Sequence, residues 1–185
     1  MKPTVLIVPG LPDDAEDRWQ MLLANKIEDA VIVPPLHEDP LWLAARVASL
    51  NAAIGTLGGP VLLVAHGAGV MIAVHWSQHH DREIQGALLI APTDLESPLP
   101  AGYPQLEAIR DNGWLPIPRR KLRFPAIVVA STNDPLGPIE QIEKYALAWG
   151  ARLVALGPLG HLDAATAIGE WPRAEVLLQE LSGAR

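Results

Sequence analysis

The stretch from Val61 to His79, which reads VLLVAHGAGVMIAVHWSQH, decides the fold. It begins with five consecutive apolar residues, a run that is typical of a strand buried on both faces of a parallel sheet. A turn of small residues, His66-Gly67-Ala68-Gly69, comes next, and the residues from Val70 to His79 are expected to form a helix. The stretch therefore predicts a strand, tight turn and helix of an α/β protein.

The rest of the chain continues this alternation on both sides. Short apolar runs predict strands, and apolar residues spaced by three or four positions predict helices. Asp39 and Pro40 are expected to cap and begin the second helix. The expected strands cover residues 5–8, 30–33, 61–65, 86–91, 126–130 and 152–156, and the expected helices cover 14–27, 40–57, 70–79, 104–111, 138–149 and 172 onward. This order predicts one α/β domain over residues 1–185, a three-layer αβα sandwich around a mainly parallel sheet of about six strands.

Composition excludes several classes of partner and chemistry. The formal net charge is -7, and the basic residues form no cluster, so neither nucleic acid nor a membrane surface is an expected partner. The absence of cysteine excludes disulfides, a cysteine nucleophile and thiolate metal sites. The longest apolar runs are only strand-sized, and the first of them is too short for a signal peptide. We therefore expect a cytoplasmic protein.

Three segments that follow expected strands carry polar residues suited to catalysis. They are His66-Gly67-Ala68-Gly69, Ser131-Thr132-Asn133-Asp134-Pro135 and Gly160-His161-Leu162-Asp163. Sites in α/β sheets form at the carboxyl ends of strands. A strand, tight turn and helix with small flanking residues is also the setting of the G-x-S-x-G nucleophile elbow, which precedes the acid and the histidine along the chain. Gly67 takes the place of the nucleophile.

These segments resemble the small serine-hydrolase family of the α/β-hydrolase superfamily, to which the retinoblastoma-binding serine hydrolase belongs. The resemblance covers nearly the whole chain. It rests on Val8-Pro9-Gly10-Leu11, Asp17-Arg18-Trp19-Gln20, Ala65-His66-Gly67-Ala68-Gly69, Ala91-Pro92, Ser131-Thr132-Asn133-Asp134-Pro135, Ala148-Trp149-Gly150-Ala151 and Gly160-His161.

The resemblance implies an α/β-hydrolase fold without a lid domain and an esterase-like site that needs no cofactor and no metal. By position, Asp134 matches the triad acid and His161 the triad base. The backbone N–H groups of Leu11 and Ala68 match the oxyanion hole, and Gly67 matches the serine. The chain departs from the family at Arg18 and Asp163 as well, where histidine and asparagine are usual.

Glycine cannot form an acyl-enzyme, because it has no side chain to attack the acyl carbon. We therefore expect a nearly inactive hydrolase, either a natural pseudo-enzyme or a serine-to-glycine variant. One alternative is an enzyme that uses His161 and Asp134 as a general-base dyad, with water in the space of the missing side chain. Another is a module that binds a small ligand or a protein. The expected partner is a small acyl compound, with a protein partner or a second copy of the chain also open.

Other residues receive weaker assignments. His37, after a strand, is a candidate for substrate binding, and Trp114 is expected either to form a substrate-facing wall or to close the core. His66 is expected to pack away from the pocket. Histidines 75, 79 and 80 share one helix end, where they more simply complement the helix dipole than bind a metal. Neither Ser131 nor the Thr93-Asp94 pair occupies an elbow, so neither is expected to replace the nucleophile.

Overall fold

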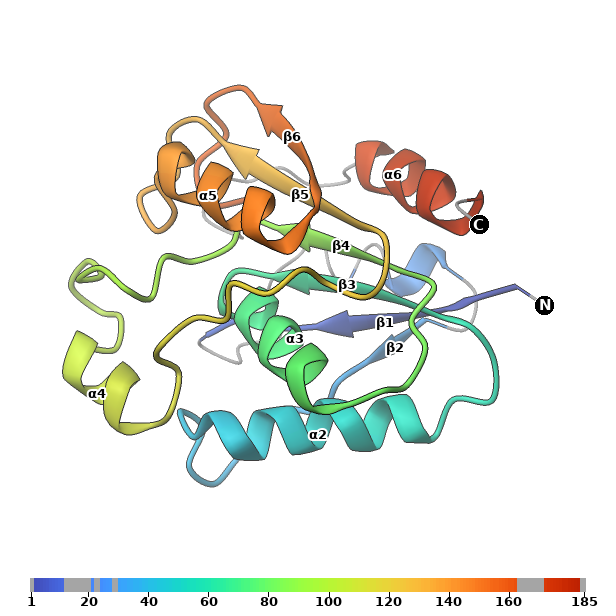
Figure 1. Ribbon diagram of the computed structural model, residues 1–185, viewed down its shortest axis with the longest axis horizontal. Helices are drawn as coiled ribbons and strands as arrows, with labels where there is room; N and C mark the ends of the chain where they lie inside the picture. The colour runs from blue at the N-terminus through green and yellow to red at the C-terminus, as the bar shows by residue number, and fades with distance from the viewer. Residues whose placement is uncertain (1, 12–20, 22–23, 28–29, 163–171, 184–185) are drawn as a thin grey trace.

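A single six-stranded parallel sheet forms the centre of the molecule (Figure 1). The computed structural model describes residues 2–11, 21, 24–27, 30–162 and 172–183. The strand order is β2-β1-β3-β4-β5-β6. The strands are β1 (Thr4–Val8), β2 (Val31–Ile32), β3 (Val61–His66), β4 (Gly86–Ile90), β5 (Ala126–Ser131) and β6 (Arg152–Leu156). Because every pairing is parallel, the carboxyl ends of all six strands meet at one edge of the sheet.

Helices cover both faces of the sheet, as the alternating sequence predicts. They are α2 (Leu43–Gly55), α3 (Ala68–His79), α4 (Leu106–Asp111), α5 (Ile139–Trp149) and α6 (Pro172–Gly183). Side chains alternate across each strand, so Leu6 and Val8 pack in the core beneath α2, α3 and α5, while Val5 and Ile7 pack in the core beneath α6. The three layers are therefore confirmed, and the described residues contain no lid domain.

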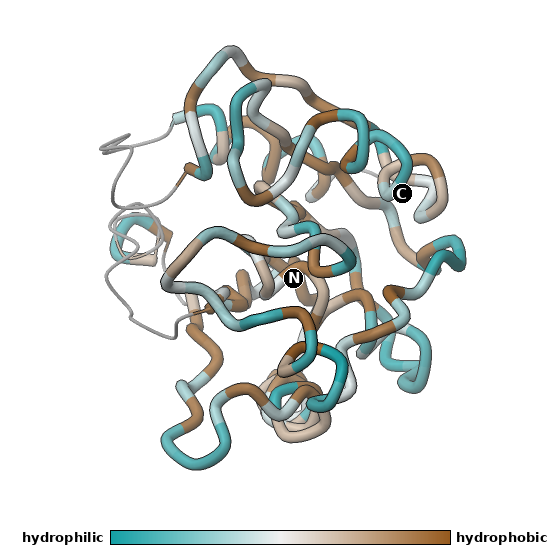
Figure 2. The backbone as a smooth tube through the Cα atoms, turned by 90° about the vertical axis from the view of Figure 1, so that its left-hand side faces the viewer, coloured by the Kyte–Doolittle hydropathy of each residue, from teal (hydrophilic) through white to brown (hydrophobic). Residues whose placement is uncertain are grey.

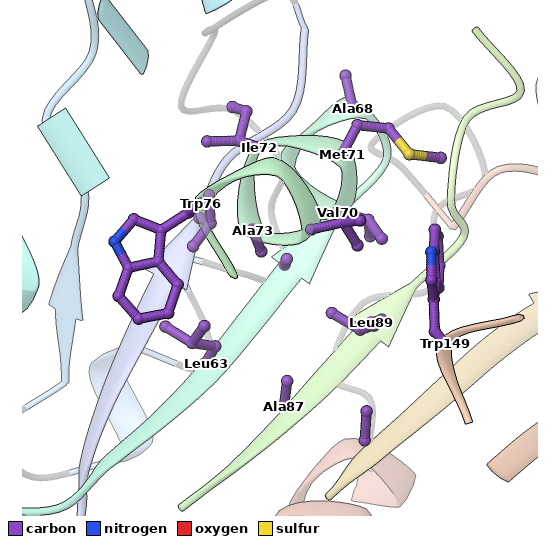
Figure 3. Close-up of a cluster of buried hydrophobic side chains, with 14 of the residues drawn as sticks. Leu63, Ala68, Val70, Met71, Ile72, Ala73, Trp76, Ala87, Leu89 and Trp149 are labelled. Atoms are coloured by element: carbon purple, nitrogen blue, oxygen red, sulfur yellow. The ribbon is translucent and has the colours of Figure 1, made fainter. Parts of the chain in front are cut away.

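The first two turns of helix α3 are buried on every side, from Ala68 to Val74, where the helix packs on one face of the sheet. Figure 3 shows its residues Val70 and Ala73 facing Leu63 of β3 and Leu89 of β4, all of which are buried. A helix segment that is buried on every side is held by close packing and cannot shift without opening voids. The turn at its N-terminus is consequently a rigid place for a site.

The helix ends differ from the predictions in two places. Helix α2 begins at Leu43 with Trp42 as its N-cap, so the predicted cap at Asp39 and first turn at Pro40 are wrong. Asp39 has a positive φ of 46° and its carbonyl accepts a hydrogen bond from the Trp42 N–H at 2.9 Å, which makes a separate turn before the helix. Most of the helix expected over 14–27 lies outside the described residues.

Hydropathy follows this layering. In Figure 2 many of the most hydrophilic stretches lie along outer turns, while the hydrophobic ones pass through the interior. None of the helices in the described part of the chain is long and apolar enough to cross a membrane.

Candidate active site

The carboxyl edge of the sheet brings together the segments that the sequence singled out. The turns after β1, β3, β5 and β6 carry Leu11, Gly67, Asp134 and His161. The turn after β4 adds Thr93. Five parallel strands thus supply one residue each to the same rim, which is where ligands bind in open α/β sheets.

Gly67 forms a sharp turn between β3 and α3. Its φ of 55° and ψ of -124° lie in a region that residues with a side chain rarely adopt. Its N–H donates to the carbonyl of Ile90 at 3.0 Å, which ties the turn to the neighbouring strand β4. A strained turn of this kind, between a buried strand and a buried helix, is the backbone of a nucleophile elbow.

Gly69 lets the first turn of α3 pass against the end of β1. A Cβ atom on Gly69 would stand 2.4 Å from the carbonyl oxygen of Val8 and 2.5 Å from that of Pro9. These are backbone atoms that cannot rotate away, so the position requires glycine. The prediction that small residues flank the elbow because strand and helix backbones pass closely is confirmed at this residue.

Asp134 and His161 form a buried hydrogen-bonded pair. The ring Nδ1 of His161 lies 2.8 Å from Oδ2 of Asp134, and both residues are less than a tenth exposed. The other carboxylate oxygen accepts the Leu136 N–H at 2.8 Å. Because a carboxylate only accepts hydrogen bonds, Nδ1 carries the proton and Nε2 is left with a free electron pair, as a general base requires.

The basic nitrogen of this pair faces the elbow. A Cβ atom on Gly67 would stand 3.1 Å from Nε2 of His161 and 3.6 Å from its Cε1. A side chain at residue 67 would therefore point toward Nε2 of His161. Two residues 94 positions apart in the sequence meet here in the geometry that a hydrolase needs between nucleophile and histidine.

Hydrogen bonds between the loops hold the acid and the base in register. The Ser131 hydroxyl accepts the Leu159 N–H at 2.9 Å, and Oδ1 of Asn133 accepts the Gly160 N–H at 2.7 Å. The loop that carries Asp134 is thereby fastened to the loop that carries His161. The sequence pointed to the Ser131–Asp134 motif because of its aspartate. In the structure, the serine and asparagine of this motif hold the loop that carries His161.

His66 adds a second brace. Its Nε2–H donates to the backbone carbonyl of His161 at 2.9 Å, and the two rings lie 4.8 Å apart. The side chain is buried. What the sequence did not reveal is that it holds the histidine loop in place, since that contact joins residues far apart in the chain.

The two predicted oxyanion donors lie near each other at the start of α3. Ala68 is the first residue of the helix, so its N–H lies outside the ladder of intrahelical hydrogen bonds. The turn that carries Leu11 passes directly over it, because a Cβ atom on Gly10 would stand 3.4 Å from the Ala68 nitrogen. That these N–H groups stabilise an oxyanion stays a prediction.

The two predicted substrate-binding residues have different surroundings. His37 is exposed on the connection that follows β2, and its role in binding stays a prediction. Trp114 has no exposed surface and donates its indole N–H to the Leu41 carbonyl at 2.7 Å. It closes the core, so the assignment of Trp114 as a substrate-facing wall is wrong. Large apolar area and a satisfied N–H make burial favourable there.

The histidines at the far end of α3 lie apart from the elbow. His75 Nε2–H donates to the Trp114 carbonyl at 3.0 Å, and burial lowers the pKa of His75. Within the described residues, no group of three or more histidine, aspartate and glutamate side chains is arranged to hold a metal ion.

Comparison with known proteins agrees with this geometry. A family model described as serine hydrolase matches residues 5–180. A search of the curated proteins found no match. Among solved structures, a YdeN-like hydrolase from Pectobacterium atrosepticum is 28% identical, with a TM-score of 0.81, over 98% of this chain and 91% of its own.

Two more distant structures share the fold. The ydeN gene product of B. subtilis is 19% identical, with a TM-score of 0.74, over 97% of this chain and 98% of its own. A thermophilic esterase from Thermogutta terrifontis is 14% identical, with a TM-score of 0.68, over 97% of this chain and 90% of its own. Together with the near-complete family match, the sheet order and the elbow lead to one conclusion: this chain is an α/β-hydrolase-fold protein that belongs to the serine hydrolase family.

Proposed function

We propose that this protein binds small acyl compounds at the carboxyl edge of its sheet and hydrolyses them only at a very low rate. The site has the acid and base of an esterase-like hydrolase, and Gly67 stands where the nucleophile would be. Neither a metal nor an organic cofactor takes part in the proposed chemistry.

The observation that carries the proposal is the alignment of three residues. Asp134 orients His161, and Nε2 of His161 stands 3.1 Å from the Cβ position of residue 67. A carboxylate and histidine that only stabilised the fold would not need the second ring nitrogen of the histidine to face the elbow. The pair is instead arranged to take a proton from a group at residue 67.

The missing side chain limits the rate. In serine hydrolases the hydroxyl oxygen forms a covalent acyl-enzyme, which splits one difficult step into two easier ones. Without it, the oxyanion donors and substrate binding supply only the residual part of catalysis, which is about 10³- to 10⁴-fold over water in a protease that lacks its triad. The proposed oxyanion donors are the N–H groups of Leu11 and Ala68, which stand at the same rim as His161.

The substitution Gly67→Ser tests the proposal. The new Cβ would be 3.1 Å from Nε2 of His161, so the imidazole must give by a few tenths of an ångström. We expect Gly67→Ser to hydrolyse p-nitrophenyl acetate and butyrate at least about a hundredfold faster than the unchanged protein, with a burst of p-nitrophenol from acylation.

Two variants serve as matched controls. Gly67→Ala adds the same Cβ without a hydroxyl, and Gly67→Ser combined with His161→Ala has the hydroxyl without the base. Both should hydrolyse the esters no faster than the unchanged protein. If Gly67→Ser folds, as measured by circular dichroism, and gains no more activity than Gly67→Ala, the proposed function is wrong and a binding module without acyl chemistry becomes the better hypothesis.

A further inference from the structure

Thr93 and His161 both lie close to the position of the missing nucleophile. Its Oγ1 is 3.4 Å from the point where a Cβ of residue 67 would stand, and Nε2 of His161 is 3.1 Å from the same point. Thr93 is 4% exposed and His161 is 8% exposed. Two polar atoms on different loops therefore flank one small region that is mostly shielded from solvent.

Backbone hydrogen bonds hold Thr93 in this place. Its N–H donates to the Gly67 carbonyl at 3.4 Å, and the next N–H, that of Asp94, donates to the Leu136 carbonyl at 2.7 Å. The Asp94 carboxylate in turn accepts from the Tyr145 hydroxyl at 3.2 Å. The loop after β4 is thus fastened to both the elbow and the acid loop, which fixes the backbone of Thr93 beside Gly67.

The two side chains have complementary hydrogen-bonding capacity. The Thr93 hydroxyl makes no hydrogen bond to any side chain or backbone group in the described part of the chain. A hydroxyl offers one donor and two acceptor sites, and Nε2 of the neutral imidazole offers one acceptor. A molecule between them that both donates and accepts, such as water, would satisfy both groups.

We propose that Thr93 and His161 hold a water molecule beside Gly67 and that this water is the nucleophile of the unchanged protein. The inference rests on the proposed function, because it uses the same acyl-binding site. Thr93 binds and orients the water, and His161 is its general base.

The reaction is a single displacement by water. Nε2 of His161 takes a proton as the water oxygen bonds to the acyl carbon, and the carbonyl electron pair moves onto its oxygen. The tetrahedral oxyanion then collapses, the bond to the alcohol oxygen breaks, and the leaving alkoxide takes the proton from Nε2. One ester and one water yield one acid and one alcohol, and no acyl-enzyme forms.

The geometry favours water over Thr93 itself as the attacking group. The Thr93 hydroxyl is not hydrogen-bonded to Nε2 of His161, whereas an activated nucleophile contacts its base. Thr93 also follows β4 and does not occupy the elbow, where the nucleophile of this fold stands. A water that bonds to both groups would link them as a mediated contact.

The test measures slow hydrolysis of p-nitrophenyl acetate by the unchanged protein and three variants. Thr93→Val replaces the hydroxyl with a methyl group of similar size, and we expect kcat to fall about tenfold with KM unchanged. Thr93→Ser restores the hydroxyl and should recover kcat to within about threefold. Thr56→Val, which removes a hydroxyl that bonds to Ala53 on the exposed end of α2, should leave kcat unchanged.

A second background separates this inference from the proposed function. With Gly67→Ser present, the serine hydroxyl replaces the water in acylation, so adding Thr93→Val should change the acylation burst rate by less than about threefold. If Gly67→Ser is active but Thr93→Val leaves the slow hydrolysis intact, only the water site is wrong. If the unchanged protein accumulates an acetyl group, seen by intact mass spectrometry, the water mechanism is overturned in favour of a covalent one. If Gly67→Ser is itself inactive, the proposed function fails first.

Discussion

Histidines lie at both ends of helix α3, yet only the N-terminal end has the parts of an active site. At the N-terminal end, Gly67 faces the ring of His161, which comes from a distant loop. At the C-terminal end, His75, His79 and His80 line a cavity of about 580 Å³ together with Trp42. The difference lies in what each ring contacts.

The contacts explain why histidines alone do not make a base. The Nδ1 of His161 donates to a buried carboxylate, so its second nitrogen is free to accept a proton. His75 uses Nε2 to donate to a backbone carbonyl, which fixes the ring as a tie between α3 and the segment at Trp114. The first arrangement prepares proton transfer, and the second holds two parts of the fold together. Substitutions at the two ends of the helix are therefore expected to have different effects.

The largest expected effect is the loss of the acid at the N-terminal end. In the Gly67→Ser background, Asp134→Asn should lower kcat for p-nitrophenyl acetate by about 10⁴-fold, because the amide no longer selects the right tautomer of His161. The matched change at the other end, His75→Asn in the same background, should alter kcat by less than about twofold. Comparable losses from both variants would mean that the two ends are not functionally distinct.

Gly69→Ala is expected to have the next largest effect, on folding. The added methyl would meet the carbonyl oxygens of Val8 and Pro9 at 2.4 and 2.5 Å, so urea unfolding should show a loss of about 3 kcal/mol. Gly55→Ala at the end of α2 is the control, since its Cβ would meet nothing within 4 Å. A stability change for Gly69→Ala as small as that for Gly55→Ala would show that the elbow can relax.

A smaller effect is expected at His66, which braces the histidine loop without facing the nucleophile. In the Gly67→Ser background, His66→Ala should lower kcat about tenfold and leave KM unchanged, because the brace on the His161 carbonyl is lost. Thermal unfolding of the same protein measures how much of the loss is structural. A change in KM alone would assign His66 to substrate binding.

The smallest expected effect is a pH dependence of stability that arises from His75, near the C-terminal end of α3. Burial, with a contribution from His79, lowers the pKa of His75 from its ordinary 6.5. As the pH falls below 6.5, the unfolded chain takes up a proton at His75 more readily than the folded protein does, so stability decreases.

Thermal unfolding between pH 7.5 and 5 should therefore show a smaller loss of midpoint temperature for His75→Gln than for the unchanged protein. The exposed His79 provides the control, and His79→Gln should follow the unchanged curve more closely. An identical pH dependence for the unchanged protein and His75→Gln would contradict the assignment.

Much of the fold could be predicted from the sequence, because the spacing of apolar residues in strands and helices is a local property. All six strands were predicted to within about two residues at each end, as were α3, α4, α5 and the start of α6. The error at Asp39 arose because Asp-Pro is typical of a helix start and equally of a turn. In the structure, Leu43 is buried and its N–H donates to the carbonyl of the distant Asn112 at 3.1 Å, a contact that the local sequence does not reveal.

The sequence by itself determined the alternation of strands and helices, the elbow around Gly67, and the candidate acid and base at Asp134 and His161. These features depend on residue type and on spacing along the chain, which can be read directly. The aim of Nε2 at residue 67, the bracing by His66 and the position of Thr93 were decided only by the tertiary structure. Each of them joins loops that follow different strands, and only the parallel sheet brings those strand ends to one edge.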